Sequence, residues 1–176
     1  MSTVILGVCG SIAAYKAAEV ASRLVKKGHE VHCVCTPTAL RFVTPLTLMT
    51  LSRHPVVSSF DDEIGDWVPT HISLAQKADA LAIVPASAHS IACFAHGLAP
   101  NVLTSLYLAN RAPVLIFPAM NSNMWSHPAT QQNVATLTAR GDRVFTPASG
   151  PLACGTEGHG RLLDVEDIVH HIEDVL

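Results

Sequence analysis

The sequence contains few charged residues and few aromatic ones. Only 14% of its 176 residues are charged and 5% are aromatic, and 11 Lys and Arg residues stand against 14 Asp and Glu residues. The resulting formal net charge of -3 favours neither a nucleic acid nor an anionic membrane as a partner. We therefore expect this protein to act on a small molecule.

A long apolar run and a secretory leader are also absent. Gly, Pro, Ser and His interrupt every apolar stretch before it reaches the ~18 residues of a membrane span. Only Met1, Ser2 and Thr3 precede the first apolar run, without the basic residues and the small-residue cleavage site of a signal peptide. These observations predict a cytoplasmic protein with no membrane partner.

Cysteine and histidine spacings typical of metal sites are missing as well. The five cysteines have no CxxC pair, and they are Cys9, Cys33, Cys35, Cys93 and Cys154. In a reducing compartment we expect them to be small buried residues, with Cys154 as the exception. His29 and His32 flank the start of a strand, whereas His170 and His171 are adjacent on a helix and point to different sides. We predict no metal.

Apolar residues, in contrast, are abundant. They make up 49% of the chain, and the mean hydropathy is +0.33. A chain of 176 residues suffices for one packed domain but not for two, so we predict a single domain over residues 1–176. Because charged residues fall well below the ~25% of a typical soluble domain, we expect other subunits of a homo-oligomer to cover part of the surface.

Short β-branched runs alternate with longer helical patterns, which is typical of βαβ units around a parallel sheet. The predicted strands are Val4–Val8, Val31–Cys35, Ala80–Val84, Val114–Phe117 and Arg143–Phe145. One predicted helix follows the first strand and stops at Gly28, and the others lie near Thr38–Leu51, Ser87–Gly97, Asn101–Asn110, His127–Arg140 and Val165–Val175. Because the strands are mostly apolar, helices must cover both faces of the sheet. The sequence predicts an α/β fold with a doubly wound parallel sheet in three α/β/α layers.

The segment Thr146–Leu163 has neither a strand period nor a helix period, because glycine and proline recur along it. We predict a long loop here. Loops of this length inside compact domains are usually functional lids or disordered, so we expect a flexible flap near residues 147–163.

Three predicted strands end in small and polar residues. The first runs through Gly10 and Ser11 into a helix, and this turn is equally consistent with an anion site and with a plain N-cap. The GxxG spacing, and hydroxyls at Thr36 and Thr38 in place of an acid, argue against a dinucleotide and favour a phosphate or a mononucleotide. The third strand leads to Ser87. The fourth leads to the stretch 118–125, and in open α/β sheets such carboxyl ends converge on one ligand crevice.

Five segments give the chain a resemblance to a known family. They are Gly7–Ala13, His71–Ile72, Pro85–Ala88, Pro118–Trp125 and Ala153–Leu162. Together they resemble the homo-oligomeric flavin-containing cysteine decarboxylases over nearly the whole chain, and the PAMNxxMW stretch is specific whereas the GxxGS turn is not. The resemblance implies a flavodoxin-like (Rossmann-like) fold. It also implies a homo-oligomer, either a trimer or a dodecamer of trimers, with sites built between protomers.

The resemblance further implies FMN as the cofactor. The residues expected to bind it are Gly10, Ser11, Ile12, Thr36, Thr38, Ser87, Ala88, His89 and Met120. The residues expected to bind the substrate are Asn121, Met124, Trp125 and Arg161. Two positions depart from the family pattern, because His89 stands where an Asn is usual and Pro100 stands where an acid is usual.

His71, Asn121 and Cys154 match the catalytic positions of the family. In the implied mechanism oxidised flavin takes two electrons from the thiol carbon of a cysteine, and the resulting C=S group accepts the electron pair as CO2 leaves. Asn121 is expected beside the leaving carboxylate, and His71 is expected to reach it across a subunit interface. Cys154 is expected to donate a proton when the product is reduced, within a flap that closes and excludes water.

Cys154 favours one branch of this family, whose members convert 4'-phosphopantothenoylcysteine to 4'-phosphopantetheine in coenzyme A biosynthesis. Peptidyl-cysteine decarboxylases of lantibiotic type usually lack this cysteine, and they are the nearest alternative. A non-catalytic flavin-binding regulatory subunit is a second alternative, against which the presence of His71 and Asn121 argues. A flavin prenyltransferase of similar fold would not carry PAMNxxMW.

Overall fold

Five parallel strands form the central sheet of the computed structural model, which describes residues 1–63, 67–151 and 157–176. The strands are β1 (Thr3–Val8), β2 (Glu30–Cys35), β3 (Ala80–Ala86), β4 (Val114–Pro118) and β5 (Arg143–Val144). Their order across the sheet is β2-β1-β3-β4-β5, the flavodoxin-like order of a doubly wound sheet. The predicted fold class and all five predicted strands are therefore confirmed.

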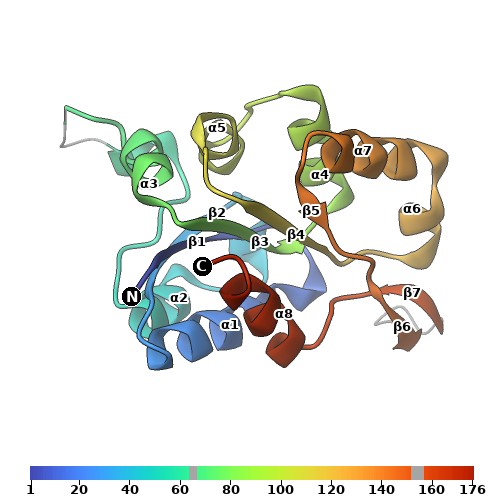
Figure 1. The fold of residues 1–176 in the computed structure, drawn as a ribbon, viewed down its shortest axis with the longest axis horizontal. Helices are drawn as coiled ribbons and strands as arrows, with labels where there is room; N and C mark the ends of the chain where they lie inside the picture. Colours follow the sequence, from blue (N-terminus) through green and yellow to red (C-terminus); the bar gives the residue numbers. More distant parts are fainter. Residues whose placement is uncertain (64–66, 152–156) are drawn as a thin grey trace.

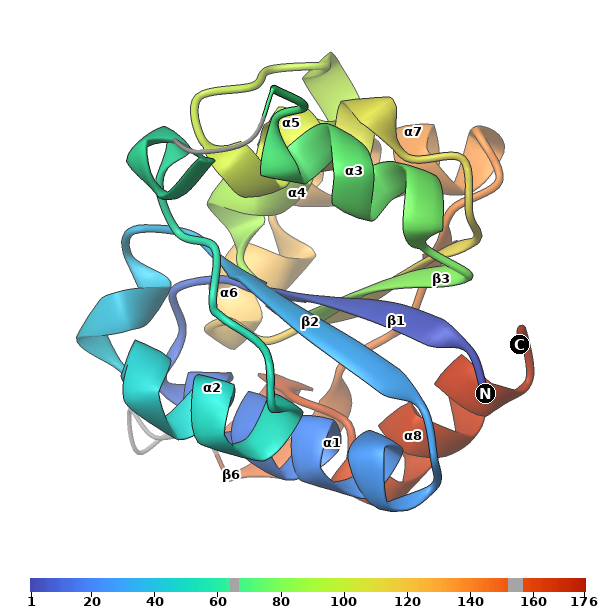
Figure 2. The same ribbon diagram turned by 90° about the vertical axis from the view of Figure 1, so that its left-hand side faces the viewer.

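Helices cover both faces of this sheet, as the apolar strands require (Figures 1 and 2). One layer contains α1 (Tyr15–Lys26), α2 (Pro45–Ser52) and α8 (Val165–Glu173), and the other contains α3 (Thr70–Lys77), α4 (Ala88–His96), α5 (Val102–Ala109) and α7 (Pro128–Ala139). Strand β3 shows how the two cores are separated. Ala82 and Val84 pack in the core between the sheet and α1, whereas Leu81 and Ile83 pack against α4 and α5. Successive side chains of a strand point to opposite faces of the sheet.

The continuous helix expected near Thr38–Leu51 is wrong. A short 3-10 helix (Ala39–Arg41) is followed by a break, and α2 begins only at Pro45. Proline lacks the N–H that a helix interior needs and forces the preceding residue into an extended conformation, and Thr44 has a ψ of 148°. The Thr44 hydroxyl oxygen accepts a hydrogen bond from the Thr47 N–H and caps the new helix.

The long loop expected over Thr146–Leu163 is also wrong for the residues that the structure describes. They form an antiparallel pair, β6 (Ala148–Pro151) and β7 (Glu157–Arg161), in which Gly150 lies opposite Gly158. Glycine-rich strands show no apolar alternation, so the sequence pattern could not reveal this pair. Cys154, in the predicted flap, lies outside the described residues.

Three further elements complete the chain. They are the 3-10 helices Ile12–Ala14 and Phe60–Glu63 and the short helix α6 (Ser122–Ser126). The sequence analysis predicted none of these three. Helix α6 packs against β7 (Figure 1). Among the described helices, none combines the length and the apolar character needed to cross a membrane.

Candidate active site

A cleft of about 620 Å³ opens where β1, β3 and β4 end. Its lining comes from the turns after these strands, from the start of α1, from α6 and from β7. The lining residues are Gly10, Ser11, Ile12, Ala13, Tyr15, Lys16, Ser87, Ala88, Ala119, Met120, Asn121, Met124, Gly160, Arg161 and Leu162. The volume lies within the range of small-molecule and cofactor sites. The expected convergence of three strand ends on one crevice is present.

The turn after β1 forms one wall of the cleft. The Ser11 hydroxyl oxygen accepts a hydrogen bond from the Ala13 N–H at 3.3 Å, and its O–H donates to the Ala119 carbonyl at the same distance. Ser11 therefore both caps the helical turn and ties it to the end of β4. Gly10 has to lack a side chain here, because a Cβ would lie 2.5 Å from the Thr38 Cγ2 atom.

Thr36 and Thr38 are not among the residues that line the cleft. Thr36 is buried, and its hydroxyl oxygen accepts a hydrogen bond from the Ala39 N–H at 3.3 Å. Thr38 contacts Gly10 and thereby supports the wall from behind. The predicted role of these two hydroxyls in cofactor binding stays a prediction.

The turn after β3 forms a second wall, and Ser87 and Ala88 line it. The Ser87 hydroxyl oxygen accepts a hydrogen bond from the Ser90 N–H at 3.2 Å and so caps α4. His89 does not line the cleft. It is exposed, and its Nε2 lies 3.6 Å from the Cys93 Sγ one turn further along α4.

The end of β4 and strand β7 form the third wall, and they approach each other closely. The Met120 N–H donates to the Gly160 carbonyl at 3.0 Å, and a Cβ on Gly160 would overlap the Met120 carbonyl oxygen. A glycine is therefore required for this contact. Asn121 lines the cleft beside it, with its Oδ1 accepting a hydrogen bond from the Asn123 N–H at 2.9 Å.

The charged residues of the described cleft lining are Lys16 and Arg161, and both are cations. This electrostatic pattern suits an anionic ligand. Arg161 also forms an exposed ion pair with Asp164 at 3.0 Å. Met124 lines the cleft as expected, whereas the half-buried Trp125 does not.

Tyr15 and Lys16 are lining residues that the sequence analysis missed. They occupy the first turn of α1, immediately after the Ser11 turn, at positions outside the buried stripe of this helix. Their exposed positions directly after the polar Ser11 turn could have indicated that both side chains line the same site.

His71 does not line the cleft of its own chain. It lies at the start of α3, where its ring meets the Phe60 ring edge-on at a centroid distance of 6.0 Å. Helix α3 and the β6–β7 pair are at opposite ends of the molecule in Figure 1. Within one chain the structure therefore brings Asn121 to the cleft but not His71.

Buried cysteines do not supply a nucleophile to this site. Burial raises the pKa of Cys9 to about 11 and that of Cys33 to about 12, and it also raises the pKa of Cys35. These thiols are therefore protonated at neutral pH and act as packing residues. The prediction that the cysteines other than Cys154 are buried is confirmed for all four of them.

The doubly wound sheet places the protein in the flavodoxin-like class, and the cationic lining of the cleft at its carboxyl edge suits an anionic small molecule. The whole chain, residues 1–176, matches the Flavoprotein family. The chain belongs to this family.

Comparison with particular proteins points to one group of flavoproteins. The chain is 43% identical over 175 residues to a probable phosphopantothenoylcysteine decarboxylase of Streptococcus mutans, with 98% of each chain covered. It also matches bifunctional coenzyme A biosynthesis proteins of Vibrio species, and it spans 43% of their length.

Two solved structures show the same likeness in three dimensions. A PPC decarboxylase mutant complexed with pantothenoylaminoethenethiol superposes with a TM-score of 0.87 at 31% identity, covering 98% of this chain and 96% of that one. The FMN-dependent cysteine decarboxylase SpaF superposes with a TM-score of 0.85 at 31% identity, covering 99% and 97%. The resemblance to the flavin-containing cysteine decarboxylases is thereby confirmed.

Proposed function

We propose that this protein catalyses the FMN-dependent decarboxylation of 4'-phosphopantothenoylcysteine to 4'-phosphopantetheine, a step of coenzyme A biosynthesis in the cytoplasm. The observation that carries the proposal is the cationic cleft at the carboxyl ends of β1, β3 and β4, in a chain that matches a probable phosphopantothenoylcysteine decarboxylase over 98% of both lengths. Both the cofactor and the substrate carry a phosphate, and the cationic lining is suited to such groups.

The described lining fits a flavin mononucleotide. Apolar side chains of Ile12, Tyr15 and Met124 offer surfaces for a flat ring system, and the hydroxyls of Ser11 and Ser87 offer polar contacts. Of the residues predicted to bind FMN, six line the cleft, namely Gly10, Ser11, Ile12, Ser87, Ala88 and Met120. These six would hold the cofactor.

When bound, oxidised flavin supplies a two-electron acceptor for the thiol-bearing carbon of the substrate, without which its carboxylate has no route to leave. Asn121 lines the cleft, where it would orient the departing carboxylate. Arg161, on the same wall, would attract the anionic substrate. In our proposal the thiol of Cys154 delivers the proton that completes the saturated product.

The site is completed by a second copy of the chain in this proposal. Three large apolar side chains at the cleft are exposed in the single chain, with Ile12 at 62%, Tyr15 at 61% and Met124 at 50%. Exposed apolar patches of this kind favour a subunit interface. A neighbouring subunit that covers this rim could bring its own His71 to the cleft, which fits a homo-oligomer whose sites lie between protomers.

Purified protein tests the proposal directly. We expect a yellow flavin absorption spectrum, and release of CO2 with formation of 4'-phosphopantetheine when 4'-phosphopantothenoylcysteine is added. A peptide that ends in cysteine is the matched control substrate. Turnover of the peptide alone would favour the peptidyl-cysteine alternative, and bound flavin without turnover of either substrate would favour a regulatory subunit.

A further inference from the structure

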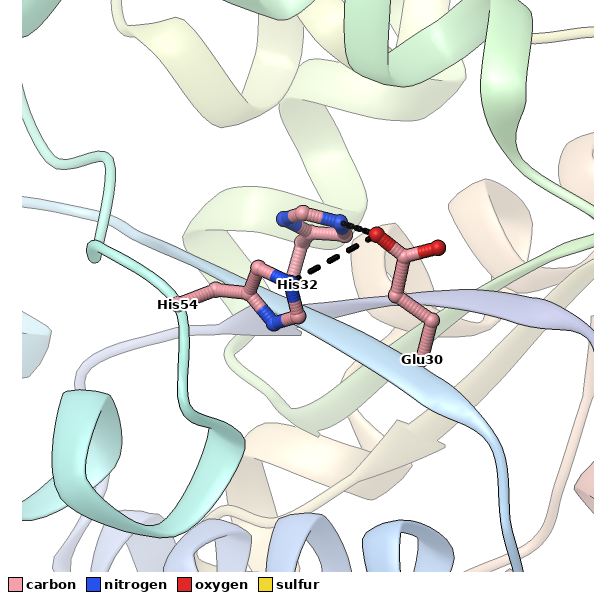
Figure 3. Close-up of side chains that lie close together, drawn as sticks. All are labelled: Glu30, His32 and His54. Carbon is pink, nitrogen blue, oxygen red and sulfur yellow. Dashed lines mark hydrogen bonds and ion pairs between the residues drawn. The ribbon is translucent and has the colours of Figure 1, made fainter.

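Two histidines and a glutamate meet at the edge of the sheet, away from the cleft. Glu30 and His32 belong to β2, and His54 lies in the segment after α2 (Figure 3). The His32 Nε2 is 2.9 Å from the Glu30 Oε1, and the His54 Nε2 is 3.5 Å from the same oxygen. One ligand atom from each residue lies within 4.8 Å of those of the other two.

The backbone fixes this arrangement. Glu30 and His32 are two residues apart in a strand, so their side chains project from the same face. Helix α2 ends at Arg53 in a left-handed conformation with a φ of 64°, which redirects the chain toward β2. Val57 then pairs with β2, because its N–H donates to the Cys33 carbonyl at 3.1 Å. His54 is thus held alongside the strand.

Hydrogen bonds outside the cluster orient its members. The Thr3 hydroxyl donates to the Glu30 Oε2 at 3.3 Å, and the other carboxylate oxygen, Oε1, is the one that meets the two imidazoles. The His54 Nδ1 lies 3.0 Å from the Ser52 carbonyl oxygen. A carbonyl only accepts hydrogen bonds, so this nitrogen carries a proton. In a neutral ring the His54 Nε2 then bears a lone pair.

The His54 Nε2 lies 3.5 Å from the Glu30 Oε1, a separation at which both atoms can contact one bound cation. In tetrahedral zinc sites with bonds of about 2.0–2.2 Å, neighbouring ligand atoms are about 3.4 Å apart. The distances of 2.9 and 3.5 Å to the Glu30 oxygen bracket this value. The two contacts to Glu30 therefore already have the spacing of metal ligands, and all three ligand atoms lie within 4.8 Å of one another.

We propose that Glu30, His32 and His54 form a site for a divalent transition-metal ion, with Zn²⁺ as the best match. Two imidazoles and one carboxylate are a common zinc ligand set and leave a fourth position for water. The sequence analysis predicted no metal, and His54 is distant from the other two residues along the chain. Only the pairing of Val57 with β2 brings it to them.

The proposed ion lies away from the cleft. Glu30 begins β2 and His32 lies two residues further on, whereas the cleft lies at the carboxyl edge of the sheet, so about 10–17 Å of strand separates these two residues from that edge. A metal here would join the edge strand β2 to the segment that follows α2. It would not take part in the proposed decarboxylation, and the inference is independent of that function.

Titration of the chelator-treated full-length protein with Zn²⁺ tests the site. We expect one ion per chain, a tautomer change in which the His32 ring proton moves from Nε2 to Nδ1, and a higher melting temperature. His54→Gln should weaken the affinity at least tenfold and abolish the shift in melting temperature. His170→Gln removes an exposed histidine and is the matched control, which should bind as the wild type does.

A second variant keeps the test informative if His54→Gln folds poorly. Burial is the main cause that lowers the pKa of His32, and the positive charge of Lys77 acts in the same direction. This charge opposes a bound cation, so Lys77→Met should tighten zinc binding rather than weaken it. Equal zinc affinity in the wild type, His54→Gln and Lys77→Met would show that zinc binds elsewhere and overturn the proposal. Failure of the wild type to bind zinc would overturn it as well.

Discussion

Gly160 holds β7 against the end of β4, and its replacement by alanine should damage both stability and ligand binding. An added Cβ would overlap the Met120 carbonyl oxygen, so the two backbones have to separate. Separation breaks the 3.0 Å hydrogen bond from the Met120 N–H to the Gly160 carbonyl, which costs about 1 kcal/mol. Residual overpacking adds about 1–3 kcal/mol. We expect Gly160→Ala to lower the free energy of unfolding by about 2–4 kcal/mol.

Gly97→Ala is the matched control for this change. Gly97 ends α4 with a φ of 65°, and no atom lies within 4 Å of the position its Cβ would take. Its replacement should therefore cost about 1 kcal/mol through backbone strain alone and leave flavin affinity unchanged. Urea unfolding measures the stability of both variants, and titration of flavin fluorescence measures the affinity. Equal stability and equal flavin affinity in the two variants would refute the steric argument for Gly160.

Three further predictions concern single side chains. His71→Asn should abolish decarboxylation while flavin stays bound, and co-expression with Asn121→Ala should restore activity in mixed oligomers. No recovered activity would contradict a site shared between subunits. Cys154→Ser should still release CO2 but accumulate an oxidised, enethiol-type product detectable by mass spectrometry, and unchanged formation of the saturated thiol would exclude its role as proton donor. Tyr107→Phe removes a 2.6 Å hydrogen bond to Asp142 and should lower the free energy of unfolding by about 1–2 kcal/mol at neutral pH. Burial raises the pKa of Asp142, and the hydrogen bond from Tyr107 opposes this rise because it favours the ionised carboxylate. The loss of unfolding free energy in Tyr107→Phe should therefore shrink as the pH falls through that pKa. A loss that is independent of pH would count against this pairing.

Local chemistry explains which parts of the fold the sequence could predict. Apolar strands and amphipathic helices are read from residues a few positions apart, and glycine and proline mark the turns between them. The turns at Ser11, Ser87 and Asn121 were therefore identified correctly as neighbours in one crevice. Pro45 carries an equally local signal, because a proline starts a helix and does not fit its interior, and the predicted helix across it is wrong for this reason.

Contacts between distant segments could not be predicted in the same way. The close approach of Gly160 to Met120 places β7 over the cleft, yet a glycine-rich segment has no period that indicates a strand. Lys16 becomes part of the cleft only because α1 starts beside the ends of β3 and β4.

The amino-acid sequence by itself determined the order of the five central strands, most of the helices between them, the three polar turns and the family resemblance, because these depend on residue type and short spacing. The tertiary structure alone decided which surfaces face each other. It placed Lys16 and Arg161 in one cleft, brought His54 to Glu30 and His32, and left His71 outside the cleft of its own chain. Such juxtapositions arise from packing of the whole chain around its core, and no stretch of sequence contains them.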